Sequence, residues 1–153
     1  MSVMPAIVLV DDDEMHLVVA KRAIARSQLQ ANVHAAATGT DALRLLGLAP
    51  DATTTASDVA VVMLDIGLPD ISGWEVLERI RQSPRWQKLP VVMVSSSDRP
   101  EDVLRGYELG ANSYVVKRHE TGRPGAYLAA AARYWVELNA APRVAHEPLL
   151  PEA

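Results

Sequence analysis

Several short apolar runs in this chain are followed directly by side chains that could do chemistry. These are the carboxylates of Asp11, Asp12, Asp13 and Asp65, the hydroxyls of Ser95, Ser96 and Ser97, and the ammonium group of Lys117. Carboxylates that gather at one place repel each other, so the arrangement persists only if a partner offsets that cost. Mg²⁺ is such a partner, because it binds a few carboxylate oxygens together with water and phosphate oxygens.

An acidic cluster joined by a lysine and a hydroxyl has the composition of a phosphoryl-transfer centre. Asp65 follows the clearest apolar run, VAVVML, and would be the nucleophile that forms an aspartyl phosphate. Mg²⁺ would neutralise the charge on the phosphoryl oxygens. Lys117 would pair with one of these oxygens, and Ser95 would donate a hydrogen bond to another.

This chemistry requires the groups to meet, and the periodicity of the apolar residues predicts how they do so. Strands are expected at 6–10, 32–36, 59–64, 90–94 and 113–116, and helices at 13–28, 40–46, 73–82, 100–109 and 125–138. Alternating strands and helices form a parallel sheet, and right-handed crossovers place helices on both of its faces. Ligands of such doubly wound α/β sheets bind beyond the carboxyl ends of the strands, where the candidate groups lie.

Composition limits the class of protein. A chain of 153 residues with 49% hydrophobic residues suits one domain with a real core. A net charge of −4 argues against direct binding to DNA. No segment approaches the roughly 20 apolar residues that cross a membrane, so a cytoplasmic protein is expected. No cysteine is present.

Four segments resemble, in order, the signatures of response-regulator receiver domains. They are IVLVDDDE, VVMLDIGLPDISGWEVL, LPVVMVSSS and GANSYVVK. The resemblance implies a flavodoxin-like (βα)5 fold with strand order 2-1-3-4-5. It also implies a switch phosphorylated by a sensor histidine kinase, not a conventional enzyme. We expect the receiver domain to span residues 5–139 and residues 140–153 to form a flexible tail, with no output domain.

The resemblance assigns the metal site to four residues. Asp11 and Asp12 correspond to the acidic pair of the family, with Asp12 as the direct ligand of Mg²⁺ and Asp11 acting partly through water. Asp65 corresponds to the phosphoacceptor. Gly67 would offer its backbone carbonyl to the metal.

The same resemblance assigns the switch. Ser95 occupies the position of the switch hydroxyl, Tyr114 that of the switch aromatic, and Lys117 that of the family's lysine. One residue departs from the pattern, since Arg118 stands where receivers usually have a proline after a cis bond. A cis bond to a non-proline residue costs about 3–4 kcal/mol. We therefore predict a trans Lys117–Arg118 bond and a rearranged or mobile loop after it.

Two features suggest partners. The segments ANSYVVK and ARYWVELNAAP, with Tyr134, Trp135 and Asn139, resemble single-domain regulators paired with bacteriophytochrome histidine kinases. An apolar stripe on the last predicted helix suggests a homodimer through the face formed by residues 100–109, 113–116 and 125–138. The stripe consists of Leu128, Ala132, Trp135 and Leu138. The alternative is that this stripe only packs on the sheet.

Other interpretations compete with this one. A phosphatase with an aspartate nucleophile would need a second acid two residues later, where this chain has Gly67. A pseudo-receiver would keep the fold and act as a binding module without phosphorylation. Neither a G-x-G-x-x-G dinucleotide motif nor a P-loop is present. Asp13 is expected to cap a helix, and the histidines, which lack metal-ligand spacing, are expected to be surface or local residues.

Overall fold

The parallel sheet has the predicted strand order. The structure is a computed structural model that describes residues 4–52, 56 and 58–142. Its strands are β1 (Ala6–Val10), β2 (Asn32–Ala36), β3 (Val59–Leu64), β4 (Val91–Ser95) and β5 (Ser113–Val116). They pair in parallel in the order β2-β1-β3-β4-β5. This confirms the doubly wound, flavodoxin-like sheet expected from the sequence.

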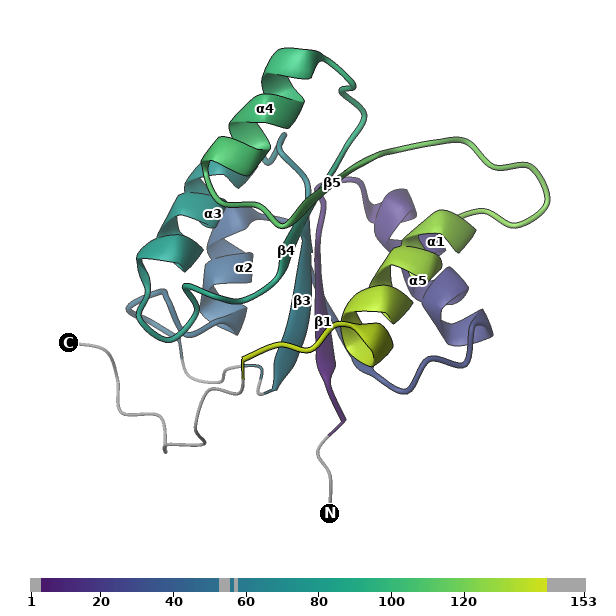
Figure 1. The fold of residues 1–153 in the computed structure, drawn as a ribbon, viewed down its shortest axis with the longest axis horizontal. Helices are drawn as coiled ribbons and strands as arrows, with labels where there is room; N and C mark the ends of the chain where they lie inside the picture. Colours follow the sequence, from purple (N-terminus) through teal and green to yellow (C-terminus); the bar gives the residue numbers. More distant parts are fainter. Residues whose placement is uncertain (1–3, 53–55, 57, 143–153) are drawn as a thin grey trace.

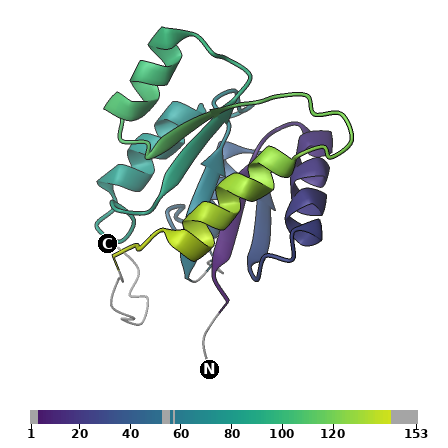
Figure 2. The same ribbon diagram turned by 45° about the vertical axis from the view of Figure 1, so that its right-hand side comes forward.

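Helices cover both faces of the sheet. They are α1 (Glu14–Arg26), α2 (Gly39–Leu45), α3 (Gly73–Gln82), α4 (Pro100–Glu108) and α5 (Ala126–Arg133), followed by the π-helical segment η1 (Tyr134–Leu138). Figure 1 shows α2, α3 and α4 on one side of the strands and α1 and α5 on the other, and the turned view in Figure 2 agrees.

Alternate side chains of the strands feed two cores, because successive residues of a strand point to opposite faces. Val8 and Val10 of β1 pack with α2 and α3 in one core. Ile7 and Leu9 of the same strand pack with α1 and α5 in the other. All four side chains are buried, so β1 is a central strand, and packing on both faces fixes the position of its carboxyl end.

The structure moves several predicted boundaries, and three of them bear on the site or on the last helix. Helix α1 begins at Glu14 because Asp13 is its N-cap and accepts hydrogen bonds from the amides of Met15 and His16, which confirms the expected capping role. Strand β4 continues through Ser95, so this serine is the last strand residue. The final helix is α-helical only as far as Arg133. Beyond it the amide of Asn139 donates to the carbonyl of Tyr134, five residues back, as in a π-helix.

The loop after β5 is attached to the start of α5. No peptide bond among the described residues is cis, so the predicted trans Lys117–Arg118 bond is confirmed. The amide of Arg118, which proline would lack, donates to the hydroxyl of Tyr127 over 3.4 Å. The carboxylate of Glu120 accepts from the amide of Tyr127 over 3.0 Å. The loop therefore has its own anchors on α5, and its predicted rearrangement stays a prediction.

Two expectations concern the ends of the chain and the membrane. Of the tail predicted at 140–153, residues 143–153 lie outside the described part. Among the described residues, no helix combines the length and apolar character needed to span a bilayer.

Gly73 lets α3 start directly against the end of β3. A Cβ atom at this position would lie 2.1 Å from the backbone oxygen of Asp65 and 2.8 Å from the Cα atom of Ile66. Both are backbone atoms, so no side-chain rotation could relieve the contact. In contrast, a Cβ atom at Gly67 would meet nothing within 4 Å.

We therefore expect Gly73→Ala to lower the free energy of unfolding by about 1–3 kcal/mol, the usual cost of overpacking. Gly67→Ala is the matched control and should change this free energy by less than about 0.5 kcal/mol. Urea unfolding followed by tryptophan fluorescence measures both. Equal stabilities of the two variants would contradict the close approach of α3 to β3.

Candidate functional site

The sheet itself places the chemical groups at one edge. Hydrogen bonds continue the strand ladders just beyond β1, β3 and β5. The amide of Asp11 donates to Ala36, that of Asp65 to Val10, and that of Lys117 to Ser95, over 3.1, 2.9 and 2.8 Å. Because the strands are parallel, their carboxyl ends share this edge, as the sequence predicted.

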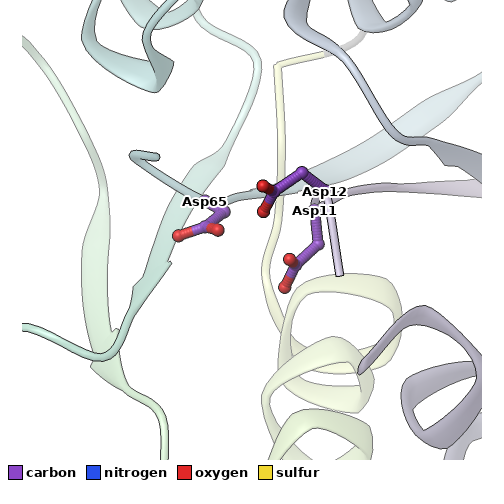
Figure 3. Close-up of side chains that lie close together, drawn as sticks. All are labelled: Asp11, Asp12 and Asp65. Carbon is purple, nitrogen blue, oxygen red and sulfur yellow. The ribbon is translucent and has the colours of Figure 1, made fainter. Parts of the chain in front are cut away.

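Three carboxylates gather at this edge. One oxygen each from Asp11, Asp12 and Asp65 lies within 4.8 Å of the others. Asp11 and Asp65 are buried, whereas Asp12 is exposed. Figure 3 shows the carboxylate of Asp12 turned toward Asp65, while that of Asp11 points to one side. Clustered hard oxygen donors with one solvent-facing member fit a Mg²⁺ ion that keeps part of its water shell.

Lys117 lies between the two buried carboxylates. Its Nζ atom is 2.8 Å from Oδ2 of Asp11 and 3.4 Å from Oδ2 of Asp65. The side chain of Lys117 is only 19% exposed, so its charge is largely withdrawn from water. A buried charge is tolerated when it is paired, and here one ammonium group serves two carboxylates.

The pKa values follow from burial and this pairing. Burial raises the pKa of Asp11, but hydrogen bonds from His16 and Lys117 outweigh this effect and lower the pKa to about 2. Burial raises the pKa of Asp65, and the attraction of Lys117 offsets this only in part. Burial lowers the pKa of Lys117, but the hydrogen bond to Asp11 and the charge of Asp65 outweigh it and raise this pKa. Asp11 is therefore the firmly ionised member of the pair.

The predicted switch residues Ser95 and Tyr114 are both hydrogen-bonded to Ser97. The hydroxyl of Ser95, a buried residue, accepts from the amide of Ser97 over 3.1 Å. The Tyr114 hydroxyl donates to the carbonyl of Ser97 over 2.9 Å. The Ser97 hydroxyl in turn donates to Oδ2 of Asp102 in α4 over 2.6 Å. Ser97 thus ties the end of β4 to both β5 and α4.

The loop after Asp65 is fixed at both of its ends. The amide of Ile66 donates to Oδ1 of Asp65 over 2.8 Å. Farther along, the carboxylate of Asp70 accepts from the amides of Gly39 and Thr40, each over 2.9 Å, at the start of α2. Gly67 lies between these anchors and is exposed. Its predicted carbonyl contact to a metal stays a prediction.

His16 is the contact that the sequence interpretation missed. Its Nδ1 atom lies 2.8 Å from Oδ2 of Asp11. His16 is the third residue of α1, and a side chain at this position can reach back past the N-cap, here Asp13. The spacing of Asp13 as a helix cap and His16 three residues later was visible in the sequence. The histidines were judged only by metal-ligand spacing, which does not detect a contact of this kind. In contrast, the structure brings together four residues that the sequence did predict, as expected: Asp11, Asp12, Asp65 and Lys117.

Removing the lysine should raise the pKa of Asp65 further. In Lys117→Met the attraction that now opposes burial is lost, while the repulsion from Asp11 remains. Carboxyl-carbon NMR titration should show the midpoint of Asp65 at a higher pH than in the unmodified protein. Arg118→Met removes a neighbouring charge that makes no ion pair with these carboxylates in the described structure, and it serves as the control. An unmoved Asp65 midpoint in Lys117→Met would contradict this electrostatic account.

Comparison with known proteins is consistent with this geometry. A family model for the response regulator receiver domain matches residues 7–124. A probable cyclic di-GMP phosphodiesterase of Vibrio cholerae is 32% identical over 111 residues, which are 72% of this chain and 23% of that protein. This chain therefore spans about a quarter of the length of that relative.

Two solved structures are similar over almost the whole chain. The phosphorylated cyanobacterial phytochrome response regulator RcpA superposes with a TM-score of 0.81 at 26% identity, covering 92% of this chain and 100% of that one. The bacteriophytochrome response regulator RtBRR has a TM-score of 0.71 at 36% identity, with 96% and 85% covered. The family model matches more than half of the chain, and the strand order agrees with it. The protein belongs to the response regulator receiver domains of two-component signalling.

Proposed function

We propose that Asp65 accepts a phosphoryl group from a histidine kinase in a Mg²⁺-dependent reaction, and that the phosphorylated domain signals through altered protein contacts. The observation that carries this proposal is the position of Lys117 between Asp11 and Asp65. An ammonium group beside the acceptor carboxylate can pair with a phosphoryl oxygen as soon as one arrives.

The acceptor carboxylate is held for attack. Oδ1 of Asp65 accepts from the amide of Ile66, which fixes the plane of the group and leaves Oδ2 facing Lys117. In the proposed step this oxygen forms a bond to phosphorus, and the bond from phosphorus to the donor breaks. A donor of the phosphohistidine type leaves with its nitrogen, and acetyl phosphate leaves as acetate.

The residues that would hold Mg²⁺ are Asp11, Asp12, Asp65 and the carbonyl of Gly67. The bound ion would offset the charge that accumulates where a phosphate approaches three carboxylates. The exposed position of Asp12 leaves one side of the cluster open to water and to a phosphodonor. This openness favours Asp12 as the direct ligand, with Asp11 held back by its own partners.

The response to phosphorylation would pass through the Ser97 connection. If Ser95 turns its hydroxyl toward a phosphoryl oxygen, the Ser97 amide loses its present acceptor. The Ser97 carbonyl and hydroxyl, which hold Tyr114 and Asp102, would then shift with the loop. The proposed route thus runs from a phosphoryl group on Asp65 through Ser95 and Ser97 to α4 and β5.

A bacteriophytochrome kinase is our preferred phosphodonor. RtBRR is described as a bacteriophytochrome response regulator, and it is 36% identical over nearly the whole chain. We also propose that residues 5–139 act as the receiver without direct contact to DNA, since the net charge of −4 disfavours binding to phosphates. Phosphotransfer from purified candidate kinases is the direct test.

The main alternative is a pseudo-receiver that binds partners without being phosphorylated. The buried Asp11, Asp65 and Lys117 argue against it, since a fold that needs no phosphate could replace these charges with apolar residues at no loss of stability. A hydrolytic enzyme is disfavoured because Gly67 supplies no acid two residues after Asp65.

Phosphorylation should depend on both Asp65 and Mg²⁺. Incubation with acetyl phosphate and Mg²⁺ should add one phosphoryl mass, which Asp65→Asn should abolish and chelation by EDTA should prevent. Asp12→Ala should weaken Mg²⁺ binding, measured by calorimetry, by about tenfold or more. The control Asp41→Asn removes an exposed acid of α2 and should leave labelling and Mg²⁺ affinity unchanged. Equal labelling of Asp65→Asn would refute the assignment.

The predicted homodimer needs a revised basis. Leu128 and Ala132 are buried and Trp135 packs into the core shared with α1, so the alternative explanation accounts for most of the stripe. Leu138 remains exposed, as do Leu104 and Tyr107 on α4. If these α4 side chains form a dimer face, phosphorylation should raise the sedimentation coefficient and Leu104→Glu should prevent the rise. A monomer at all concentrations with and without phosphate would exclude the dimer.

A further inference from the structure

The carboxylate of Asp11 is shared by two side-chain donors. Its Oδ2 atom accepts from Nζ of Lys117 and from Nδ1 of His16, each over 2.8 Å. Its Oδ1 atom accepts from the amide of Asp13 over 2.9 Å. Asp11 is only 5% exposed. The group is therefore an ionised, buried carboxylate whose every contact matters for its energy.

Among the residues that line the space beside His16, only His16 could donate a side-chain hydrogen bond to Asp11. A small cavity lies beside the His16–Asp11 pair, between α1, α5 and the central strands. Apart from Asp11 and His16, its lining is entirely apolar and includes Leu17, Met63 and Leu128. If one donor leaves Asp11, the walls of this cavity have no polar side chain to offer in exchange.

Lys117 has two competing destinations. It is closer to Asp11, at 2.8 Å, than to the acceptor Asp65, at 3.4 Å. In the proposed function Lys117 pairs with a phosphoryl oxygen on Asp65, which requires it to loosen its contact with Asp11. Removing one partner from a buried ion pair is costly because it leaves an uncompensated charge.

We propose that His16 is a positioning residue that keeps Asp11 hydrogen-bonded while Lys117 turns to the phosphoryl group. This inference rests on the proposed function of Asp65. His16 fixes the orientation of the Asp11 carboxylate and stays on Oδ2 when Lys117 leaves it, so the release of the lysine costs less free energy. The role requires only a hydrogen on Nδ1, which a neutral histidine can carry.

The first test compares His16→Leu with His16→Asn. Leucine removes the donor, whereas the side-chain amide of asparagine places an N–H the same number of bonds from the backbone as Nδ1. At saturating Mg²⁺ and acetyl phosphate, we expect His16→Leu to slow the labelling of Asp65 about tenfold, which corresponds to about 1.4 kcal/mol. His16→Asn should recover most of the rate. His34→Leu, in the middle of β2 and away from the strand ends, controls for the loss of a histidine.

The second test separates this role from a purely structural one. The same His16→Leu change is made in a Lys117→Ala background, where no lysine has to leave Asp11. Here it should change the rate less than about twofold, since the two residues act on one shared oxygen and their effects should not add. A full tenfold loss in both backgrounds, or equal losses in His16→Leu and His16→Asn, would overturn the inference.

Failure of the inference and failure of the proposed function have different signatures. If the unmodified protein is labelled on Asp65 but His16→Leu reacts at the unmodified rate, the positioning role alone is wrong. If the unmodified protein gains no phosphoryl group with Mg²⁺ present, the proposed function falls and this inference falls with it.

Discussion

One ammonium group shared by two buried carboxylates is the interaction on which the site depends. Among the described residues, Lys117 is the one lysine or arginine that pairs with Asp11 and Asp65 at the sheet edge. The pairing keeps Asp11 strongly acidic and limits the rise in the pKa of Asp65. Because Lys117 contacts both carboxylates, a phosphoryl group on Asp65 could draw its ammonium group away from Asp11.

The surrounding structure serves to hold this arrangement still. Parallel pairing aligns the strand ends, the close approach of α3 at Gly73 sets the path after Asp65, and Asp70 ties that path to α2. These constraints are mostly backbone contacts, so they define where the carboxylates lie without depending on long, flexible side chains. Preorganisation of this kind lowers the cost of bringing like charges together.

The contacts that surround Ser97 are of a different kind. Ser97 donates hydrogen bonds to Ser95 and Asp102 and accepts one from Tyr114, so three contacts can be exchanged at one residue. An acidic cluster held by backbone contacts beside an exchangeable loop contact suits a switch. A local change at Asp65 can then favour one of two arrangements of the Ser97 loop. The loop after β5, which follows Lys117 directly, is anchored on Tyr127 instead of by a proline.

The sequence by itself determined the order of elements and the gathering of Asp11, Asp12, Asp65 and Lys117, because side-chain periodicity and parallel topology fix where strand ends meet. The strand order was expected only from the resemblance to receiver domains. The trans bond before Arg118 also followed from local energetics. Only the tertiary structure decided that Lys117 lies closer to Asp11 than to Asp65, that His16 reaches Asp11, and that Ser97 joins β4 to α4. It also showed that most of the last helix's apolar stripe is core. Such contacts depend on helix placement and side-chain rotamers, which sequence spacing leaves open.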